Sequence, residues 1–330
     1  MDRLAVSGKV ERSAFGSGWV VLGWAVVISV SSGLIGCQAP SGVPGLEGPY
    51  LGQDPPGMTA ELFAPGIVST DEDEGCTAFL NGGTTFVFNR LERGDTAWSF
   101  IPIYVMEARN GEWGAPHPAP FQRGYNEDNF TAGPDDVTLY FQATRPRTEG
   151  GEPSPYSRLW SVRKTADGWA QPSLLEYRAG GEQFGGYPSV TADSTVYFAS
   201  SVRPGFGATD IFRTIREDGM QREAENLRPP INTEHVEIDA VVAADESYLV
   251  VTSDQPGGYG QWDLWVSFRR PDDAWTPLVN LGEGVNSSAY ESRPSLSPDG
   301  KYLFFASDRR GNGDIYWVET SVIEALRISF

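Results

Sequence analysis

The sequence has few of the residue types that most often carry catalysis or hold metals. Among 330 residues there are two cysteines and two histidines, and 25 Lys and Arg stand against 44 Asp and Glu, a formal net charge of −19. Two histidines are too few for a histidine-rich metal centre. The negative charge argues against a nucleic-acid partner, because binding a phosphate backbone needs clustered Lys and Arg. No Gly-x-Ser-x-Gly nucleophile elbow of an α/β-hydrolase occurs. We assign no catalytic residue, no metal ligand and no cofactor.

Long apolar runs are also rare, and the one near the N-terminus is typical of an export signal. A basic segment precedes the apolar run of residues 19–36, which leads into the sequence LIGC. This ending resembles a bacterial lipoprotein signal, which implies removal of residues 1–36 and lipid attachment to Cys37. The alternative is an uncleaved helix that anchors the chain in a membrane. Gln38 stands where inner-membrane lipoproteins have Asp, so we predict an outer-membrane lipoprotein that faces the periplasm.

The two cysteines leave two alternatives for the thiols. In an exported protein, a pair of cysteines suggests a disulfide. A lipid on Cys37 makes that bridge impossible, and Cys76 is then expected to be a free, buried thiol. Residues 37–58 are rich in Pro and Gly and have no periodicity, so we interpret them as an extended tether.

The rest of the chain consists of five similar units. Each has a strongly apolar segment, a Gly-rich stretch and an aromatic segment, as in YLFFASDRRGNGDIYWV and YLVVTSDQPGGYGQWDLWV. The apolar segments follow one another at intervals of 53, 57, 53 and 54 residues, starting at Thr85, Thr138, Thr195, Tyr248 and Tyr302. Self-similarity at a fixed period indicates a repeat architecture.

Every unit carries the signals of short strands. A first strand and a turn such as SPDG precede the apolar strand, an aromatic third strand follows the Gly-rich loop, and a weaker fourth strand such as WTPLVNLG comes last. Four antiparallel strands form one blade of a β-propeller. The apolar strands are apolar on both faces, as expected when neighbouring blades cover each side. A β-sandwich, the alternative, would alternate apolar with polar residues.

The two ends of the repeat region are expected to close the ring. The fifth unit lacks a fourth strand, whereas residues 60–75 resemble the segments that hold the fourth strand of units three and four. We therefore predict an all-β, five-bladed propeller over residues 59–318, with four-stranded antiparallel blades and residues 61–68 as the outer strand of the last blade. Six blades is the alternative. Residues 319–330 have the pattern of a short C-terminal helix.

The fifth unit, SRPSLSPDGKYLFFASDRRGNGDIYWV, resembles the WD-like repeats of the TolB-type propellers of bacterial envelopes. The resemblance covers nearly all of residues 59–318 and is strongest in this unit. It implies the propeller fold and an envelope setting. It leaves the function open, because propellers host many activities.

One aligned position gives the candidate site. A glutamate precedes the innermost strand in four units, and Gly185 replaces it in the third; the four are Glu74, Glu127, Glu237 and Glu291. This connection lies at one mouth of a propeller's central channel, and arginines follow the second strand on the same side, at Arg90, Arg145, Arg203 and Arg309. In one interpretation, Glu and Arg pair and lock adjacent blades. In the other, part of the ring binds a polar ligand through Glu74, Glu127, Glu237, Glu291, Arg145, Arg203 and Arg309.

We expect a monomeric, lipid-anchored, non-enzymatic binding propeller that recognises an envelope protein, a peptide or a glycan and meets the membrane only through its lipid. The alternative is a carbohydrate-active enzyme, a glycoside hydrolase or lyase, that uses Glu127, Glu237 and Glu291. Carboxyl groups about 5–9 Å apart and free of arginine would favour the enzyme. A third possibility, an assembly scaffold, predicts a large apolar face.

Overall fold

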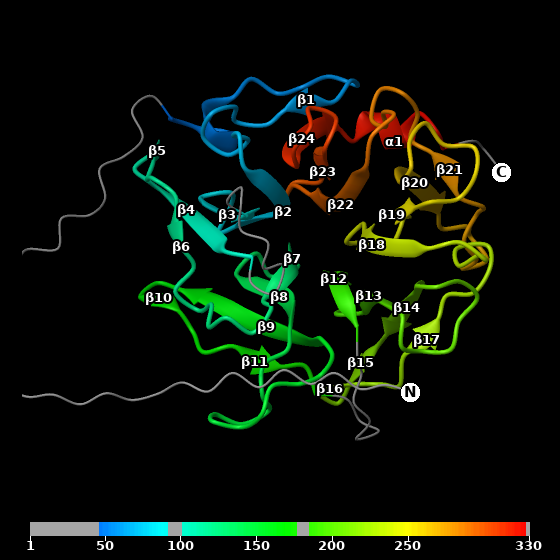
Figure 1. Ribbon diagram of the computed structural model, residues 1–330, viewed down its shortest axis with the longest axis horizontal. Coiled ribbons are helices and arrows are strands. Elements are labelled where there is room, and N and C mark those ends of the chain that lie inside the picture. The colour runs from blue at the N-terminus through cyan, green and yellow to red at the C-terminus, as the bar shows by residue number, and fades with distance from the viewer. Residues whose placement is uncertain (1–45, 92–100, 177–184, 328–330) are drawn as a thin grey trace, which may run out of the picture. The chain divides into compact units, whose positions relative to one another are not determined.

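The computed structural model describes residues 46–91, 101–176 and 185–327, which form five blades around a central axis (Figure 1). The predicted all-β, five-bladed propeller is therefore confirmed. The predicted signal peptide and the lipidation site Cys37 lie outside the described residues. Within these ranges, no helix is long and apolar enough to cross a membrane.

Each blade is an antiparallel sheet whose first strand lies nearest the axis. The inner strands are β2 (Asp73–Leu80), β7 (Asp128–Ala132), β12 (Gly186–Val190), β18 (Glu237–Val242) and β22 (Glu291–Leu296). The second strands are β3 (Thr85–Leu91), β8 (Thr138–Ala143), β13 (Val196–Ser200), β19 (Tyr248–Ser253) and β23 (Tyr302–Ser307). The third strands are β4 (Ile103–Arg109), β9 (Arg158–Thr165), β14 (Asp210–Thr214), β20 (Asp263–Phe268) and β24 (Asp314–Glu319).

The outer strands are short. They are β6 (His117–Pro118), β11 (Ser173–Leu174), β17 (Glu225–Asn226), β21 (Val279–Asn280) and, in the fifth blade, β1 (Glu61–Leu62). Small additional strands extend the third strands or form a hairpin beside them, namely β5 (Glu112–Trp113), β10 (Gly168–Trp169), β15 (Arg216–Glu217) and β16 (Met220–Gln221).

The N-terminal strand closes the ring as predicted. Strand β1 pairs antiparallel with β24, with Glu61 opposite Trp317 and Leu62 opposite Tyr316. The strand is shorter than the predicted 61–68, because the backbone turns away at Ala64, whose φ is +43°. The blade that holds the C-terminal strand is thus completed from the other end of the repeat region, and its edge is covered.

Part of the predicted tether is packed against the propeller. The 3₁₀ turn η1 (Pro49–Gly52) places Leu51 in the core, where it is 2% exposed. The indole of Trp113 donates a hydrogen bond of 2.9 Å to the carbonyl of Gly48. Tyr50 packs edge-on against Tyr302, with ring centroids 5.0 Å apart. Apolar side chains within the Pro- and Gly-rich segment therefore bind it to blades one and five.

The core consists of apolar layers between neighbouring blades. The layer at the closure is the most aromatic and includes Phe63, Phe79, Phe86, Phe304 and Trp317. A second layer, between blades four and five, also receives Val322 and Ile323 of the C-terminal helix α1 (Ser321–Glu324). Every inner layer is covered by sheets on both sides, which explains why the second strands are apolar on both faces.

Removal of the Phe63 side chain should destabilise the closure. Phe63 is fully buried and contacts Phe86, Phe304 and Trp317 at centroid distances of 5.1 to 5.5 Å. We expect Phe63→Ala to lower the free energy of unfolding by about 3–5 kcal/mol, the range for deleting a buried aromatic ring. Chemical denaturation measures this, with Phe206→Ala as the control because Phe206 is 48% exposed. Equal stability of the two variants would mean that the closure is wrongly assigned.

Candidate functional site at the channel mouth

The four predicted glutamates are buried beside the blade-to-blade connections. Glu74, Glu127, Glu237 and Glu291 are 0–2% exposed. In three of them the carboxylate accepts both the backbone N–H and the hydroxyl of the residue four positions earlier. For Glu291, these bonds from Ser287 measure 2.9 and 2.6 Å. Thr70 and Thr233 bind Glu74 and Glu237 in the same way.

Glu127 fixes its turn through backbone N–H donors and has no Thr or Ser four positions earlier. Its two carboxylate oxygens accept the N–H groups of Arg123, Gly124 and Tyr125 at 2.9 to 3.0 Å. In all four blades, the carboxylate therefore fixes the turn that leads from the outer strand of one blade to the inner strand of the next.

Arginines join three of these carboxylates and reach across to the preceding blade. The pairs are Arg90–Glu74 at 2.6 Å, Arg145–Glu127 at 2.7 Å and Arg309–Glu291 at 3.0 Å. Arg309 also donates to the carbonyl of Val285, which follows the outer strand of blade four. Arg90 likewise binds the carbonyls of Ile67 and Val68. We call each such arrangement of Glu, its turn and its Arg a blade latch.

The third and fourth blades depart from this pattern. Gly185 takes the place of the glutamate, and Arg203 of that blade lies over the ring of Phe212 at 5.5 Å. In blade four, Glu237 is bound by Thr233 and, at 3.5 Å, by the hydroxyl of Ser253. Burial raises the pKa of Glu237, an effect that the hydrogen bonds from Thr233 oppose. Burial also raises the pKa of Glu74. The hydrogen bonds from Thr70, and then the hydrogen bond and charge of Arg90, oppose this rise.

A bulge in every inner strand aims one side chain at the channel. The pairing of each inner strand with its neighbour shifts register within the first five residues of the strand. At this point the backbone has φ between +46° and +53° in four blades, at Asn129, Tyr187, Asp239 and Arg293. Such angles are uncommon for residues with a side chain, so the bulge is a specific device of this fold.

The residues at these bulges form a polar plug in the channel. A cavity of about 20 Å³ on the axis is lined by Cys76, Asn129, Tyr187, Asp239 and Arg293. The thiol of Cys76 is free and buried, as one of the two sequence alternatives predicted, and it donates to Asn129 Oδ1 at 3.4 Å. Burial raises its pKa. A thiol of this kind is inert compared with one at an electropositive surface.

Two buried carboxylates lie near the guanidinium of Arg293: Asp239, which belongs to the plug, and Asp128, which lies beside it. Asp128 accepts a hydrogen bond from the amide of Asn89, and Asp239 Oδ2 accepts the backbone N–H of Arg293 at 3.0 Å. Burial raises the pKa of Asp239 from 3.8 to about 7, and the charge of Asp128 adds to this while Arg293 opposes it. The other oxygen of Asp239, Oδ1, is buried and has no hydrogen-bond partner within the described ranges.

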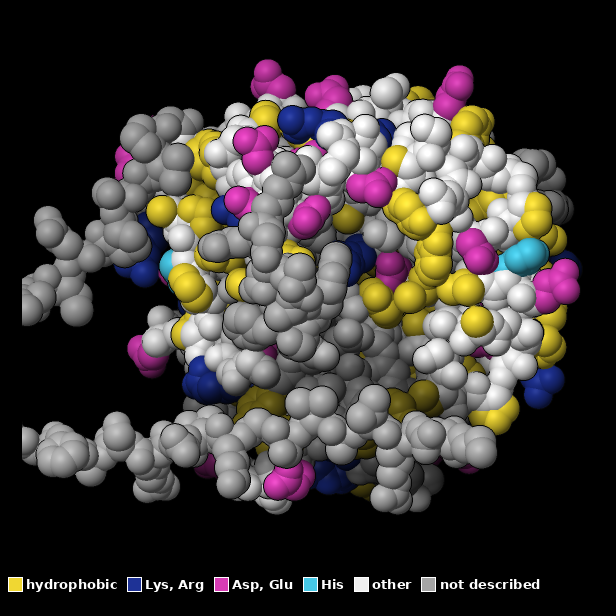
Figure 2. Space-filling view, in the orientation of Figure 1, with side chains coloured by type: hydrophobic (Ala, Val, Ile, Leu, Met, Phe, Trp, Pro, Cys, Tyr) yellow, Lys and Arg dark blue, Asp and Glu magenta, His cyan; other side chains and the backbone are white. Residues whose placement is uncertain are grey.

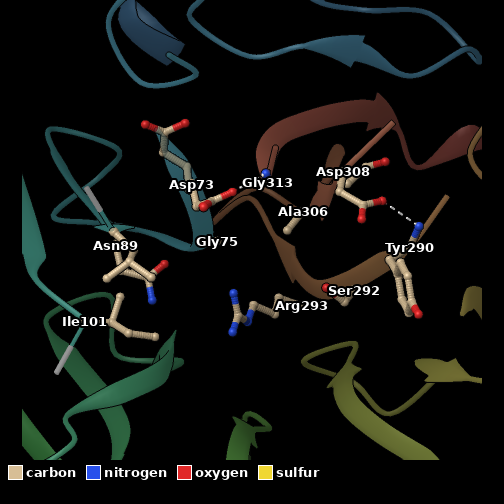
Figure 3. A pocket seen from close by; sticks show the side chains of 13 residues that line it. Asp73, Gly75, Asn89, Ile101, Tyr290, Ser292, Arg293, Ala306, Asp308 and Gly313 are labelled. Carbon is tan, nitrogen blue, oxygen red and sulfur yellow. Dashed lines mark hydrogen bonds between the residues drawn. The ribbon is translucent and has the colours of Figure 1, made fainter. Parts of the chain in front are cut away.

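Above the plug, the mouth of the channel opens into a cavity of about 210 Å³ (Figure 3). Glu74 lines it, whereas Glu127, Glu237 and Glu291 do not. Asp73, Tyr290 and Asp308 stand at its rim, and the side chain of Arg293 extends from β22 across the opening toward Gly75 and Asn89. The sequence predicted that four carboxylates partly ring the mouth; the structure brings Glu74 to this cavity and buries Glu127, Glu237 and Glu291 beside the blade-to-blade connections.

Arg293 and the other bulge residues were not predicted from the sequence. They occupy equivalent places, two residues after the position of the latch glutamate, in EGC, EDN, GGY, EID and ESR. The alignment of units contains this signal, because the five residues at this position, Cys76, Asn129, Tyr187, Asp239 and Arg293, differ from one unit to the next while the glutamate before them repeats in four units. The latch donors were also missed, although a Thr or Ser precedes Glu74, Glu237 and Glu291 by four residues.

Comparison with solved structures identifies the same architecture elsewhere. The propeller is similar to that of TolB. For TolB from Acinetobacter baumannii the TM-score is 0.50 at 15% identity, over 78% of this chain and 54% of that one. For TolB from Agrobacterium tumefaciens the TM-score is 0.45 at 14% identity, over 72% of this chain and 71% of that one. An α-L-arabinofuranosidase from Lactobacillus brevis gives 0.46 at 9% identity, over 74% and 90%.

The likeness to the A. baumannii TolB structure, at 15% identity, shows the fold alone. No family profile and no curated protein sequence matches the chain. The chain spans about half of the A. baumannii TolB protein. The resemblance to TolB-type propellers inferred from the repeats is confirmed at the level of architecture.

We expect substitution of Glu291 to destabilise the protein more than substitution of Glu237, because only Glu291 is paired with an arginine of a blade latch. Glu291→Gln and Glu237→Gln both disturb the contact with the residue four positions earlier, but only the first leaves a paired arginine, Arg309, without its carboxylate. We expect Glu291→Gln to lower the free energy of unfolding by about 1–3 kcal/mol more than Glu237→Gln, the scale of a charged hydrogen bond. Denaturant titration of both variants measures this, and equal losses would show that Arg309 adds nothing to the latch.

The buried carboxyl group of Asp239 should make the free energy of unfolding depend on pH. Its carboxyl group has a raised pKa of about 7 in the folded protein, against 3.8 when unperturbed. A carboxyl group whose pKa is raised on folding contributes its full stabilisation below the unfolded pKa. This contribution to the free energy of unfolding is lost as the pH rises through the folded pKa. Asp239→Asn should therefore be little more stable than wild type near pH 4 and more stable by on the order of 4 kcal/mol above pH 7. Thermal unfolding from pH 4 to 8 tests this; a constant difference between the two proteins would contradict it.

Proposed function

We propose that the protein is a non-enzymatic binding module of the bacterial cell envelope, tethered by lipid at Cys37, and that the mouth of its propeller channel binds a peptide, protein segment or glycan. The observation that supports this most is the mouth cavity, in which Arg293, Asp73 and Asp308 bring charges of both signs to one opening on the propeller axis. Such convergence of polar groups in a concave site is typical of ligand recognition.

The state of the carboxylates favours binding over hydrolysis. A glycosidase needs two carboxyl groups that flank the substrate and are free to exchange protons with it. Glu127 and Glu291 are buried in ion pairs with Arg145 and Arg309, and the oxygens of Glu237 accept bonds from Thr233. Engaged in this way, they serve the structure of the blades, so Glu74 is the one predicted ligand-binding glutamate that also reaches the mouth cavity.

The charge of the described surface fits a partner that is not a polyanion. On the face that Figure 2 shows, acidic side chains are spread over the described surface, and the visible basic side chains are scattered between them. With a net charge of −19 over the whole chain, long-range attraction would favour a neutral or locally basic ligand over a phosphate-rich one.

A binding screen that also records turnover tests the proposal. The soluble protein without residues 1–37 is titrated with peptidoglycan fragments, peptides and neutral oligosaccharides, and each mixture is then examined for cleavage products. We expect saturable binding with the ligand recovered intact, and weaker binding when Ser292→Phe narrows the mouth. Cleaved glycan would support the enzyme instead, and binding unaffected by Ser292→Phe would place the site away from the channel.

Lipid attachment at Cys37 has its own test. The sequence LIGC after an apolar run implies that this thiol is acylated once the preceding segment is removed. In a bacterial host, labelled palmitate should enter the wild-type protein and be absent from Cys37→Ser. Cys76→Ser is the matched control, since the buried Cys76 should leave labelling unchanged. Equal labelling of wild type and Cys37→Ser would refute the lipid anchor.

A further inference from the structure

Arg293 differs from the arginines of the blade latches. Arg90, Arg145 and Arg309 each form an ion pair of 2.6 to 3.0 Å with a buried glutamate. The Arg293 guanidinium, by contrast, donates no hydrogen bond and forms no ion pair with any residue that the structure describes. The backbone N–H of Arg293 donates to Asp239 Oδ2. The charges of nearby Asp128 and Asp239 offset that of the guanidinium, but its N–H donors have no acceptor among the described residues, so they are available to a ligand that enters the cavity.

The two carboxylates nearest to the Arg293 guanidinium, Asp128 and Asp239, accept hydrogen bonds from other groups. Burial acts to lower the pKa of Arg293, but the charge of Asp128, with smaller contributions that include Asp239, outweighs it, so the pKa is raised. Neither carboxylate forms an ion pair with the guanidinium. Asp128 is bound by Asn89, and the bulge of β22 ties Asp239 to the backbone of Arg293. The guanidinium is consequently directed along the opening toward Gly75, where a Cβ would collide with it. Glycine at position 75 leaves the room that this orientation needs.

The shape and charge of the cavity restrict what Arg293 binds. About 210 Å³ is below the 300–1,000 Å³ usual for sites that enclose a whole small molecule, so the cavity fits the end of a chain. A planar carboxylate matches the two parallel donors of a guanidinium. The acidic side chains of Asp73 and Asp308 at the rim disfavour a phosphate dianion but suit the amide N–H groups that precede a terminal carboxylate. Tyr290, 40% exposed at the same rim, offers an aromatic surface to a side chain.

We infer that the channel mouth captures the C-terminal carboxylate of a peptide, with Arg293 as the residue that binds it. This rests on the proposed binding function and specifies its ligand. The peptide enters along the propeller axis, its carboxylate meets the guanidinium above the plug, and the preceding residue lies between Tyr290 and Asp73. Capture of a chain terminus explains why the site has one cation at its base and acceptors at its rim.

The test compares peptides that differ only at the C-terminus. A mixture of N-acetylated tripeptides is prepared once as free acids and once as amides, and both are titrated into the protein without residues 1–37, with inorganic phosphate and a neutral oligosaccharide as further probes. We expect the acids to bind at least about tenfold more tightly than the amides, the effect of a lost charged hydrogen bond. Arg293→Gln should abolish this preference.

Two further variants separate recognition from stability. Arg293→Lys keeps the charge beside Asp128 and Asp239 but lacks the planar pair of donors, so it should preserve the melting temperature and still lose most of the preference for acids. Arg163→Gln is the matched control, because Arg163 is exposed and paired with Asp135 in the turn between β7 and β8 of blade two, and neither residue lines the mouth cavity. If Arg293→Gln does not fold, Ser292→Phe serves in its place by narrowing the opening.

The outcomes distinguish this inference from the proposed function. A preference for acids that depends on Arg293 and survives in Arg163→Gln supports it. Equal binding of acids and amides, or displacement of the acids by phosphate at equal concentration, overturns carboxylate recognition and leaves a binding propeller. If the oligosaccharide binds and neither the peptide acids nor the amides do, carboxylate recognition is likewise overturned and the binding function stands. Absence of binding to every probe, here and in the wider screen, overturns both.

Discussion

The propeller depends on a buried carboxylate at the start of the inner strand in four of its five described blades. A carboxylate at 0–2% exposure is unfavourable unless hydrogen bonds replace the water it has lost. Here the donors come from the turn between blades and, in three cases, from an arginine that also binds the carbonyls of the preceding blade. The same interaction therefore satisfies the charge, shapes the turn and joins two blades. Removing one partner leaves the other buried and unpaired, so the pairs are strongly linked.

This use of charge determines where a ligand site can form. The glutamates that repeat from blade to blade serve the repeated structure, and their carboxylates accept hydrogen bonds from the turns between blades. The channel, in contrast, receives one side chain from each bulge, and these five differ in every blade: Cys76, Asn129, Tyr187, Asp239 and Arg293. A nearly fivefold scaffold thereby gives an asymmetric surface on its axis. Recognition of a specific ligand needs such asymmetry, because a symmetric ring would present the same group in five directions.

Much of the architecture could be predicted from the sequence, and the reason is repetition. The intervals of 53 to 57 residues, the apolar second strands and the segment around Phe63 gave the blades and their closure, and these features depend on local pattern alone. The short length of β1 and the packing of Leu51 and Tyr50 were not predicted. Both depend on contacts with blades one and five that become visible only in three dimensions.

The candidate site was predicted less well, for a physical reason. The sequence indicates which residues lie near the start of an inner strand, but it does not indicate whether a side chain points into the turn or into the channel. That choice is made by the bulge, where one extra residue reverses the alternation of the strand. Glu291 and Arg293 are two residues apart and would share a face in a regular strand, yet one is buried in a latch and the other extends across the mouth.

The closure and the site are linked through blades one and five. The mouth cavity is lined mainly by residues of these two blades, with Asp73, Gly75 and Asn89 on one side and Tyr290, Arg293 and Asp308 on the other. Strand β1 completes blade five, and the chain then runs directly into β2 of blade one. Asp73, near this junction, accepts the N–H of Gly313 at 2.8 Å and so ties the loop before β24 to β2. Because Asp73 and the loop before β24 frame the opening, the geometry of the mouth depends on how blades one and five meet, and we expect loss of closure to disturb binding before the individual blades unfold.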